Sequence, residues 1–179
     1  MTPGAHAIDT PSPWVVRGAG AIRARGRVLD VACGGGRHLR YLNSLGFEVV
    51  GVDRDETALA GIEAAEVHVA DIEGGPWPFA AGEFDGVVVT NYLHRPLFPH
   101  LVAALRPGGV LIYETFAAGN ERYGRPSNPD FLLQPGELLW RVEPLSVIAF
   151  EEGFVSSPKE ALIQRICAVR SGDGSSRAG

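Results

Sequence analysis

The 179-residue sequence predicts an α/β protein with a doubly wound sheet of seven mainly parallel strands between two layers of helices. Short apolar runs rich in β-branched residues alternate with helical or loop segments along most of the chain. Two of these runs, VVVT at 87–90 and GVLIYE at 109–114, are continuously apolar, which is typical of central strands covered by helices on both faces. Hydrophobic residues make up 45% of the chain, enough for one globular core.

Seven runs have the composition of strands, at residues 27–32, 47–53, 66–71, 84–90, 108–114, 142–150 and 162–170. The first five are separated by helical or loop segments, so we expect them to pair in parallel. The last two are separated by little more than EEGFVSSPKE at 151–160. They predict an antiparallel C-terminal hairpin at one edge of the sheet.

Helical patterns occupy several of the connections between these strands. Regularly spaced leucines predict a helix over 37–46, which Gly46 ends. A second helical pattern at 95–107 stops at Pro107, and PGELLW begins another helix at Pro135. The helices would cover both faces of the sheet and give a three-layer αβα sandwich.

The chain is expected to form one domain over residues 14–170. An amphipathic helix within 12–26 would cover the start of this domain. Residues 1–13 and 171–179 have the composition of flexible tails.

Composition and charge exclude several classes of protein. A formal net charge of -5 gives no overall attraction to nucleic acid. Cys33 and Cys167 lie far apart in apolar segments, so neither a disulfide framework nor a metal site is encoded, and a reducing cytoplasm fits best. No signal peptide or membrane-spanning run is evident.

The stretch VLDVACGGGRHLRYL at 28–42 contains the strongest functional signal. It follows the first strand, and in doubly wound folds ligands bind beyond the carboxyl ends of the strands where strand order reverses. Glycines at 34–36 let the backbone approach a ligand, and a helix beginning near Arg37 points free N–H groups toward it. A plain tight turn between strand and helix also fits these glycines.

Neighbouring residues separate the candidate ligands. A dinucleotide site needs a third glycine where this chain has Leu39, and a phosphate loop needs a Lys-Ser or Lys-Thr pair that is missing here. Asp30, at the end of the strand, would repel a pyrophosphate and attract an ammonium group. The loop therefore favours a ligand with a positively charged end, although Asp30 equally fits a role as a cap of the glycine turn.

These residues resemble the class I S-adenosylmethionine-dependent methyltransferases, whose first motif is [DE]-x-G-x-G-x-G. Asp30, Ala32, Gly34 and Gly36 match it, with Ala32 in place of the first glycine. The resemblance continues over roughly 26–116. It includes acidic residues after the second and third strands, the fourth-strand segment EFDGVVVTNYLHR and the fifth-strand segment LRPGGVLIYE. The resemblance implies a Rossmann-like fold and S-adenosyl-L-methionine as the cofactor.

The resemblance assigns Asp53 to the ribose hydroxyls and Asp71, with Ile72 beside it, to the adenine. One carboxylate can accept both hydroxyls of a vicinal diol. Asp53 also fits a helix N-cap, and Arg17, assigned to the carboxylate of the cofactor, also fits an exposed position on a cover helix. The full cofactor-binding set expected is Asp30, Ala32, Gly34, Gly36, Asp53, Arg54, Asp71, Ile72, Asn91 and Arg17.

The reaction site is expected where the loops after the fourth and fifth strands meet the methyl group. Methyl transfer is a displacement at carbon, so a base is needed only where the acceptor carries a proton at neutral pH. His94 is the first candidate for this base, Glu114 the second, and Tyr92 a further catalytic candidate. His94 and Arg95 equally fit a role in ordering their own loop.

The segment 117–134 is read as a lid in which Tyr123, Arg125, Asn128 and Phe131 close over the acceptor, because long loops in compact domains are usually functional. With NYLHRPLFP, it resembles small bacterial methyltransferases of the tellurite-resistance type. We expect the acceptor to be a small molecule, and we expect no nucleic-acid or membrane partner. The protein is expected to be a monomer or a homodimer. An NAD-dependent oxidoreductase and a non-catalytic cofactor-binding subunit of a modification complex are the alternatives.

Overall fold

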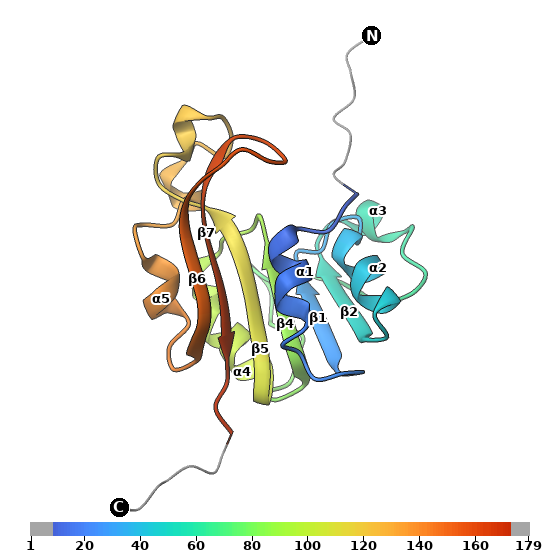
Figure 1. The fold of residues 1–179 in the computed structure, drawn as a ribbon. Helices are drawn as coiled ribbons and strands as arrows, with labels where there is room; N and C mark the ends of the chain where they lie inside the picture. Colours follow the sequence, from blue (N-terminus) through green and yellow to red (C-terminus); the bar gives the residue numbers. More distant parts are fainter. Residues whose placement is uncertain (1–8, 173–179) are drawn as a thin grey trace, which may run out of the picture.

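A computed structural model describes residues 9–172 as a seven-stranded sheet with helices on both faces (Figure 1). Strand order is β3-β2-β1-β4-β5-β7-β6. The first five strands are parallel, and β7 is antiparallel to both β5 and β6. The predicted Rossmann-like sheet and its C-terminal hairpin are confirmed. The strands are β1 Arg27–Val31, β2 Glu48–Asp53, β3 Glu66–Val69, β4 Phe84–Thr90, β5 Leu105–Phe116, β6 Ser146–Val155 and β7 Ala161–Val169.

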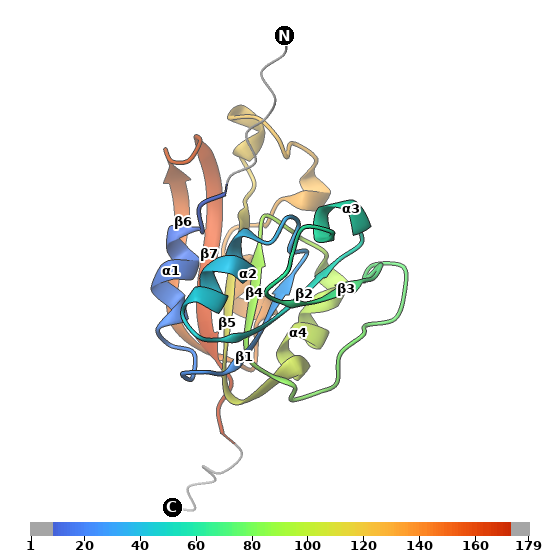
Figure 2. The same ribbon diagram turned by 90° about the vertical axis from the view of Figure 1, so that its right-hand side faces the viewer.

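Helices form the outer layers (Figure 2). Side chains of α1 and α2 pack in one apolar core, and those of α4 and α5 pack in the core on the opposite face of the sheet. None of the helices within 9–172 is long and apolar enough to cross a membrane. The helices are α1 Pro13–Ala19, α2 Arg37–Ser44, α3 Glu56–Leu59, α4 Phe98–Ala104 and α5 Glu137–Arg141, with 3-10 turns η1 Arg95–Leu97, η2 Asn120–Arg122 and η3 Pro129–Phe131.

The central strands supply both cores, which explains their continuously apolar sequences. In β1, Val28 faces the core beneath α1 and α2, whereas Leu29 faces the core beneath α4 and α5. Both side chains are fully buried. Successive residues of a strand point to opposite faces, so a strand covered on both sides needs an apolar residue at nearly every position.

The hairpin is shifted relative to its predicted first strand. Val142 is buried and forms the C-terminal cap of α5, so β6 begins at Ser146 and continues to Val155. Only 156–160 remain as the turn to β7. This turn lies at the same end of the sheet as the polar loops that follow the parallel strands.

The folded unit begins before residue 14. Ser12 is buried, its backbone N–H donates to His38 Nε2 at 3.0 Å, and its hydroxyl caps α1 by accepting from the Trp14 N–H. The prediction of a flexible tail over 1–13 therefore fails for its last residues. Residues 1–8 and 173–179 lie outside the described part of the chain.

Close packing of α2 on β2 depends on Gly51. A Cβ at this position would lie 2.7 Å from Leu39 Cδ1 and 2.8 Å from Cys33 Sγ, closer than carbon atoms pack. Leu39 occupies the position where a dinucleotide fold has the glycine that lets helix and strand approach. In this chain the glycine that allows the close approach is Gly51 on the strand, not a residue of the helix.

We predict that Gly51→Ala lowers the free energy of unfolding by about 1–3 kcal/mol, because the added methyl group overpacks this contact. Urea denaturation measures the change. Gly20→Ala is the matched control, since nothing lies within 4 Å of the new methyl group there. The control should stay within about 0.5 kcal/mol of the unmodified chain. Equal unfolding midpoints for the two variants would contradict the packing argument.

Candidate functional site

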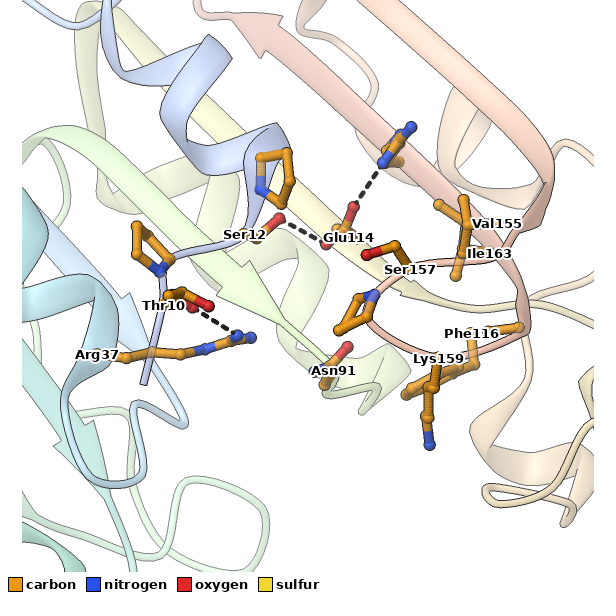
Figure 3. A pocket seen from close by; sticks show the side chains of 15 residues that line it. Thr10, Ser12, Arg37, Asn91, Glu114, Phe116, Val155, Ser157, Lys159 and Ile163 are labelled. Atoms are coloured by element: carbon orange, nitrogen blue, oxygen red, sulfur yellow. Dashed lines mark hydrogen bonds and ion pairs between the residues drawn. The ribbon is translucent and has the colours of Figure 1, made fainter. Parts of the chain in front are cut away.

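Strand order reverses between β1 and β4. Doubly wound folds bind ligands beside such a switch point, at the edge of the sheet formed by the carboxyl ends of the strands. Two cavities, of about 180 and 380 Å³, lie at this edge. The smaller is lined by Ala32, Asp53, Arg54, Ala70, Asp71, Ile72, Glu73 and Tyr92. The larger, drawn in Figure 3, is lined by residues from the N-terminal segment, the loop after β4, the end of β5 and the β6–β7 hairpin.

The loop after β1 turns through left-handed backbone conformations. Ala32 has φ 53°, Gly34 φ 52° and Gly36 φ 81°. No atom lies within 4 Å of a Cβ built at Gly34, so the loop leaves free space beside it. A left-handed alanine is unfavourable and is found where the surrounding structure enforces it, often at a binding site. Asn91, after β4, has the same strained conformation at φ 54°.

Asp53 joins the loops after β1 and β2. Its Oδ2 accepts from the Gly34 N–H at 2.8 Å, and its Oδ1 accepts from the Asp55 N–H at 2.9 Å. A carboxylate has about four acceptor positions, so Asp53 keeps capacity for a ligand in the smaller cavity. The N-cap of α3 is Asp55, which accepts from the N–H groups of Thr57 and Ala58. The alternative role of Asp53 as this cap is therefore excluded.

Asp71, Ile72 and Arg54 all line the smaller cavity. Asp71 Oδ1 accepts from the N–H groups of Glu73 and Gly74, each at 3.0 Å. These bonds lower the pKa of Asp71 and keep the exposed carboxylate ionised at neutral pH. Ile72 is buried and offers an apolar surface beside it. An ionised acceptor next to an apolar surface suits a heteroaromatic ring with an amino group.

Asp30 lies beneath the loop, with only 2% of its surface exposed, and lines neither cavity. Its Oδ2 is buried without a hydrogen-bond partner among the described residues. Burial raises the pKa of this carboxyl from 3.8 to about 8, although the nearby Arg37 guanidinium lowers it. An unpartnered buried acceptor is rare in folded proteins and indicates that a cationic or hydrogen-bonding partner is missing.

In the larger cavity, Glu114 and Phe116 project from the end of β5, two residues apart on one face of the strand. The Ser12 hydroxyl donates to Glu114 Oε1 at 2.7 Å, and Arg165 Nη1 donates to Glu114 Oε2 at 3.2 Å (Figure 3). Tyr113, which precedes Glu114, is buried on the opposite face, where its hydroxyl donates to the Tyr92 carbonyl at 2.6 Å. Tyr113 therefore supports the loop after β4 from below.

The three catalytic candidates lie in different places. Glu114 lines the larger cavity, and Tyr92 lines the smaller one, with its hydroxyl donating to Glu73 Oε1 at 2.7 Å. His94 lines neither cavity, and its Nδ1 is 3.9 Å from Glu73 Oε2. The prediction that these residues form one reaction site is therefore not supported, because Tyr92 and His94 both turn toward Glu73.

Arg17 does not reach the candidate site. Its side chain is exposed, pairs with Glu151 on β6 at 3.1 Å and stacks on the Trp14 ring. This placement matches the alternative of an exposed arginine on a cover helix. Arg37 lines the larger cavity instead and donates to the Thr10 carbonyl at 3.1 Å (Figure 3).

The segment 117–134 is fastened to the body of the protein. Arg95 donates to the carbonyls of Asp130 and Leu132, each at 2.9 Å, and makes a two-point ion pair with Glu137. The four residues expected to close over the acceptor line neither cavity. Arg95 thus acts as a clamp on this segment, and the lid prediction lacks the contacts it requires.

Several lining residues of the larger cavity were not expected from the sequence. They come from the segment before α1 and from the hairpin, both distant in sequence from the glycine loop. One signal was available, because Lys159 is the only lysine in the chain and follows Pro158 in a predicted turn. The additional residues are Thr10, Pro11, Ser12, Pro13, Val155, Ser157, Pro158, Lys159, Ala161, Ile163 and Arg165.

The strand order and the cavity at the switch point place this protein in the Rossmann-like class of doubly wound folds. A profile of the methyltransferase domain family matches residues 28–109. Over this matched region, just under half of the chain, the sequence belongs to the class I S-adenosylmethionine-dependent methyltransferases, whose methyl donor is S-adenosyl-L-methionine.

Two curated relatives illustrate the sequence similarity. The chain is 34% identical over 151 residues to a tRNA U34 carboxymethyltransferase of Methylococcus capsulatus, an alignment covering 69% of this chain and 45% of the relative. It is 34% identical over 126 residues to a ubiquinone biosynthesis O-methyltransferase of Aromatoleum aromaticum, covering 62% and 51%. The chain spans about half the length of the curated relatives it matches.

Solved structures share the fold. TehB from Haemophilus influenzae superposes with a TM-score of 0.75 at 18% identity, covering 90% of this chain and 63% of TehB. A SAM-dependent methyltransferase from Methanosarcina mazei superposes with a TM-score of 0.70 at 17% identity, covering 92% and 100%. At these identities the likeness concerns the architecture alone.

The residues of the site fit this cofactor. Asp53 offers free acceptor positions to a ribose, and the apolar Ile72 with the ionised Asp71 suits adenine. Arg37 is cationic, and the nearby unpartnered Asp30 carboxyl becomes anionic when a ligand cation lowers its pKa, so the two together suit the zwitterionic end of the cofactor. No cluster of three or more potential metal ligands occurs within residues 9–172.

We predict that binding of S-adenosylmethionine at pH 7 releases most of one proton from Asp30. The pKa near 8 keeps this carboxyl largely protonated in the free protein, and a nearby ligand cation favours the ionised form. Titration calorimetry in phosphate and in Tris measures the release as a difference in binding enthalpy. The release should vanish above about pH 9.

Asp30→Asn is the control, because it keeps the size of the side chain and removes the titration. Folding raises the pKa of Asp30, so its contribution to stability is fully present below pH 3.8 and is lost as pH rises toward 8. The Asp30→Asn variant should therefore gain stability relative to the unmodified chain as the pH rises from about 5 to about 9. Proton release that persists in this variant would assign the titration to another group.

Proposed function

We propose that this chain transfers a methyl group from S-adenosylmethionine to a small-molecule acceptor in the larger cavity. The observation that carries the proposal is the position of the loop after β4 between two cavities. Asn91 lines the larger cavity and its neighbour Tyr92 lines the smaller one. A cofactor whose nucleoside lies in the smaller cavity would present its reactive end toward the larger one.

The nucleoside half of the proposed site uses residues predicted from the sequence. Asp53 and Arg54 hold the ribose, while Asp71 and Ile72 hold the adenine. These side chains line one cavity and come from the ends of β2 and β3. Charged groups that are already held in place by backbone N–H donors lose little conformational freedom on binding.

The amino-acid half of the cofactor passes the glycine loop. Gly34 leaves free space for it, and Ala32 and Gly36 form the left-handed turns of the same loop. Asn91 follows the neighbouring strand β4 and lines the larger cavity. Arg37 replaces Arg17 as the partner of the carboxylate, because Arg37 lines the larger cavity and has no ion-pair partner among the described residues. Asp30 supplies negative potential beneath the loop for the ammonium group.

When bound, S-adenosylmethionine supplies an electrophilic methyl group on a sulfonium, which leaves as a neutral thioether. The protein then has to orient the acceptor and, for a hydroxyl or protonated amine, to remove its proton. Glu114 is the group placed for this task. Its two oxygens already accept hydrogen bonds from Ser12 and Arg165 on the wall of the larger cavity.

The size of the larger cavity supports a small acceptor. A volume of about 380 Å³ is in the range of pockets for small organic molecules. The net charge of -5 is unfavourable for binding nucleic acid, so we propose no such partner. Two buried free cysteines support a cytoplasmic location, and we propose a monomer or homodimer.

We predict that S-adenosylmethionine and its demethylated product bind the unmodified chain, and that Asp53→Asn weakens both at least tenfold. The loss corresponds to one or two charge-assisted hydrogen bonds of about 1.5–3 kcal/mol each. Titration calorimetry measures it, with Glu63→Gln, at an exposed position, as the matched control. No binding of either compound would refute the proposal. Stabilisation by NAD instead would favour an oxidoreductase.

A second prediction concerns turnover. The purified chain is added to cell extract with tritiated S-adenosylmethionine. Label should appear in the small-molecule fraction, and the RNA and protein fractions should carry no more label than in extract without the chain. Glu114→Gln should lower the labelling rate about 100-fold or more, the contribution of a general base, without changing cofactor affinity. Cofactor binding without any labelled product would indicate the non-catalytic subunit, and label in RNA would overturn the small-molecule acceptor.

A further inference from the structure

The larger cavity has a positive charge balance, although the whole chain is acidic. Three cations line it, Arg37, Lys159 and Arg165, against the single carboxylate of Glu114. The chain as a whole carries a formal net charge of -5. Charges of one sign gathered in a cleft with low-dielectric walls focus the potential inside it, so the cavity selects anions.

Arg165 is already neutralised. Its guanidinium donates to Glu114 Oε2 at 3.2 Å and pairs with Glu151 Oε2 at 2.7 Å, and it stacks on the Trp14 ring. Glu114 is neutralised in turn by the same guanidinium. This pair contributes no net charge to a ligand, and the positive balance rests on Arg37 and Lys159.

Arg37 and Lys159 occupy different parts of the cavity. Figure 3 shows them on opposite sides, with Asn91 between them. Neither has a carboxylate within ion-pair distance among residues 9–172. Arg37 is adjacent to the glycine loop, where the proposed function assigns it to the carboxylate of the cofactor. Lys159 lies in the turn between β6 and β7, on the other side of the cavity from that loop. Because Arg37 is assigned to the cofactor, Lys159 is the cation available to bind the acceptor.

The wall beside Lys159 is apolar. Its Nζ lies 5.1 Å from the centre of the Phe116 ring, and Val155 and Ile163 continue this surface on the two strands of the hairpin. Nζ also donates to the Arg125 carbonyl at 3.1 Å, which uses one of its three protons. The ammonium group is therefore held in position and keeps two donors for a ligand.

We propose that the acceptor is a small organic anion whose oxyanion binds Lys159, whose apolar body packs on Phe116 and Ile163, and whose reacting atom lies near Glu114. This inference rests on the proposed function and specifies its substrate class. A carboxylate, sulfonate or phosphate monoester shares the required chemistry. A neutral acceptor would leave the Lys159 charge without a partner, and a cationic one would be repelled by it.

The first experiment uses matched acids and amides. Benzoate, 4-hydroxybenzoate and hexanoate are titrated into the full chain saturated with S-adenosylhomocysteine, alongside the corresponding neutral amides. Each acid that binds should do so at least tenfold more tightly than its amide. Equal affinities within every pair, or binding of no acid while S-adenosylhomocysteine binds, would overturn the proposal. Failure of S-adenosylhomocysteine to bind would instead refute the proposed function, so the two failures are distinguishable.

Variants of Lys159 separate charge from structure. Lys159→Gln keeps a donor for the Arg125 carbonyl and removes the charge, so the preference for acids should fall to less than threefold. Lys159→Arg keeps the charge and should retain the preference. Affinity for the amides and for S-adenosylhomocysteine should be unchanged in both variants. An acid preference that survives Lys159→Gln would overturn the assignment of the anion to this residue.

A direct spectroscopic test is available because Lys159 is the only lysine in the chain. Incorporation of ¹³C,¹⁵N-labelled lysine marks this side chain alone and leaves its three N–H donors intact. Addition of the acids should shift the lysine side-chain signal and raise the pKa of that amine, since an anion stabilises its charged form. Amides should leave both unchanged. An unperturbed lysine signal at saturating acid would place the anion elsewhere.

Discussion

The hydrogen bond from the Gly34 N–H to the Asp53 carboxylate holds the two cofactor loops together, and the geometry of the rest of the site depends on it. It ties the strained glycine loop after β1 to the end of β2, while the other oxygen of Asp53 orders the chain toward Asp55. A carboxylate fixed in this way needs no rearrangement to accept hydrogen bonds from a ligand. The same bond holds the Gly34 backbone, beside which no atom lies within 4 Å of a built Cβ.

The two halves of the site have different origins in the fold. The smaller cavity is built from the ends of consecutive parallel strands, β1 to β4, so its residues recur at regular intervals along the chain. The larger cavity is assembled by tertiary contacts between distant segments. Ser12 and Glu114 are 102 residues apart and are joined by one hydrogen bond, and Arg165 continues the chain of contacts into the hairpin. Acceptor specificity can therefore change through these segments while the cofactor half is preserved.

This difference explains how much the sequence alone could predict. The parallel sheet follows from continuous apolar runs, which are a local pattern. The family resemblance assigned Asp53 and Asp71 from their places after the second and third strands, and both line the smaller cavity. Arg17 and His94 were assigned to the site from similar reasoning, but the direction of a side chain depends on its neighbours. Arg17 has an ion-pair partner on β6 and His94 faces Glu73, and neither partner is adjacent in sequence. Residues of the hairpin turn were missed for the same reason.

The clamp on the segment 117–134 makes distant parts of the molecule open together. Glu137 is almost fully buried, and it accepts hydrogen bonds from Arg95 and Arg141 and from the Gln134 N–H. Burial alone would raise its pKa, but these donors hold the pKa below its ordinary value. Releasing the segment would remove the Gln134 N–H donor from this buried carboxylate and would leave Arg95 without its two carbonyl acceptors, Asp130 and Leu132. Amide hydrogens of the segment and of α5 should therefore exchange as one cooperative unit, linked through Arg95 to the loop after β4.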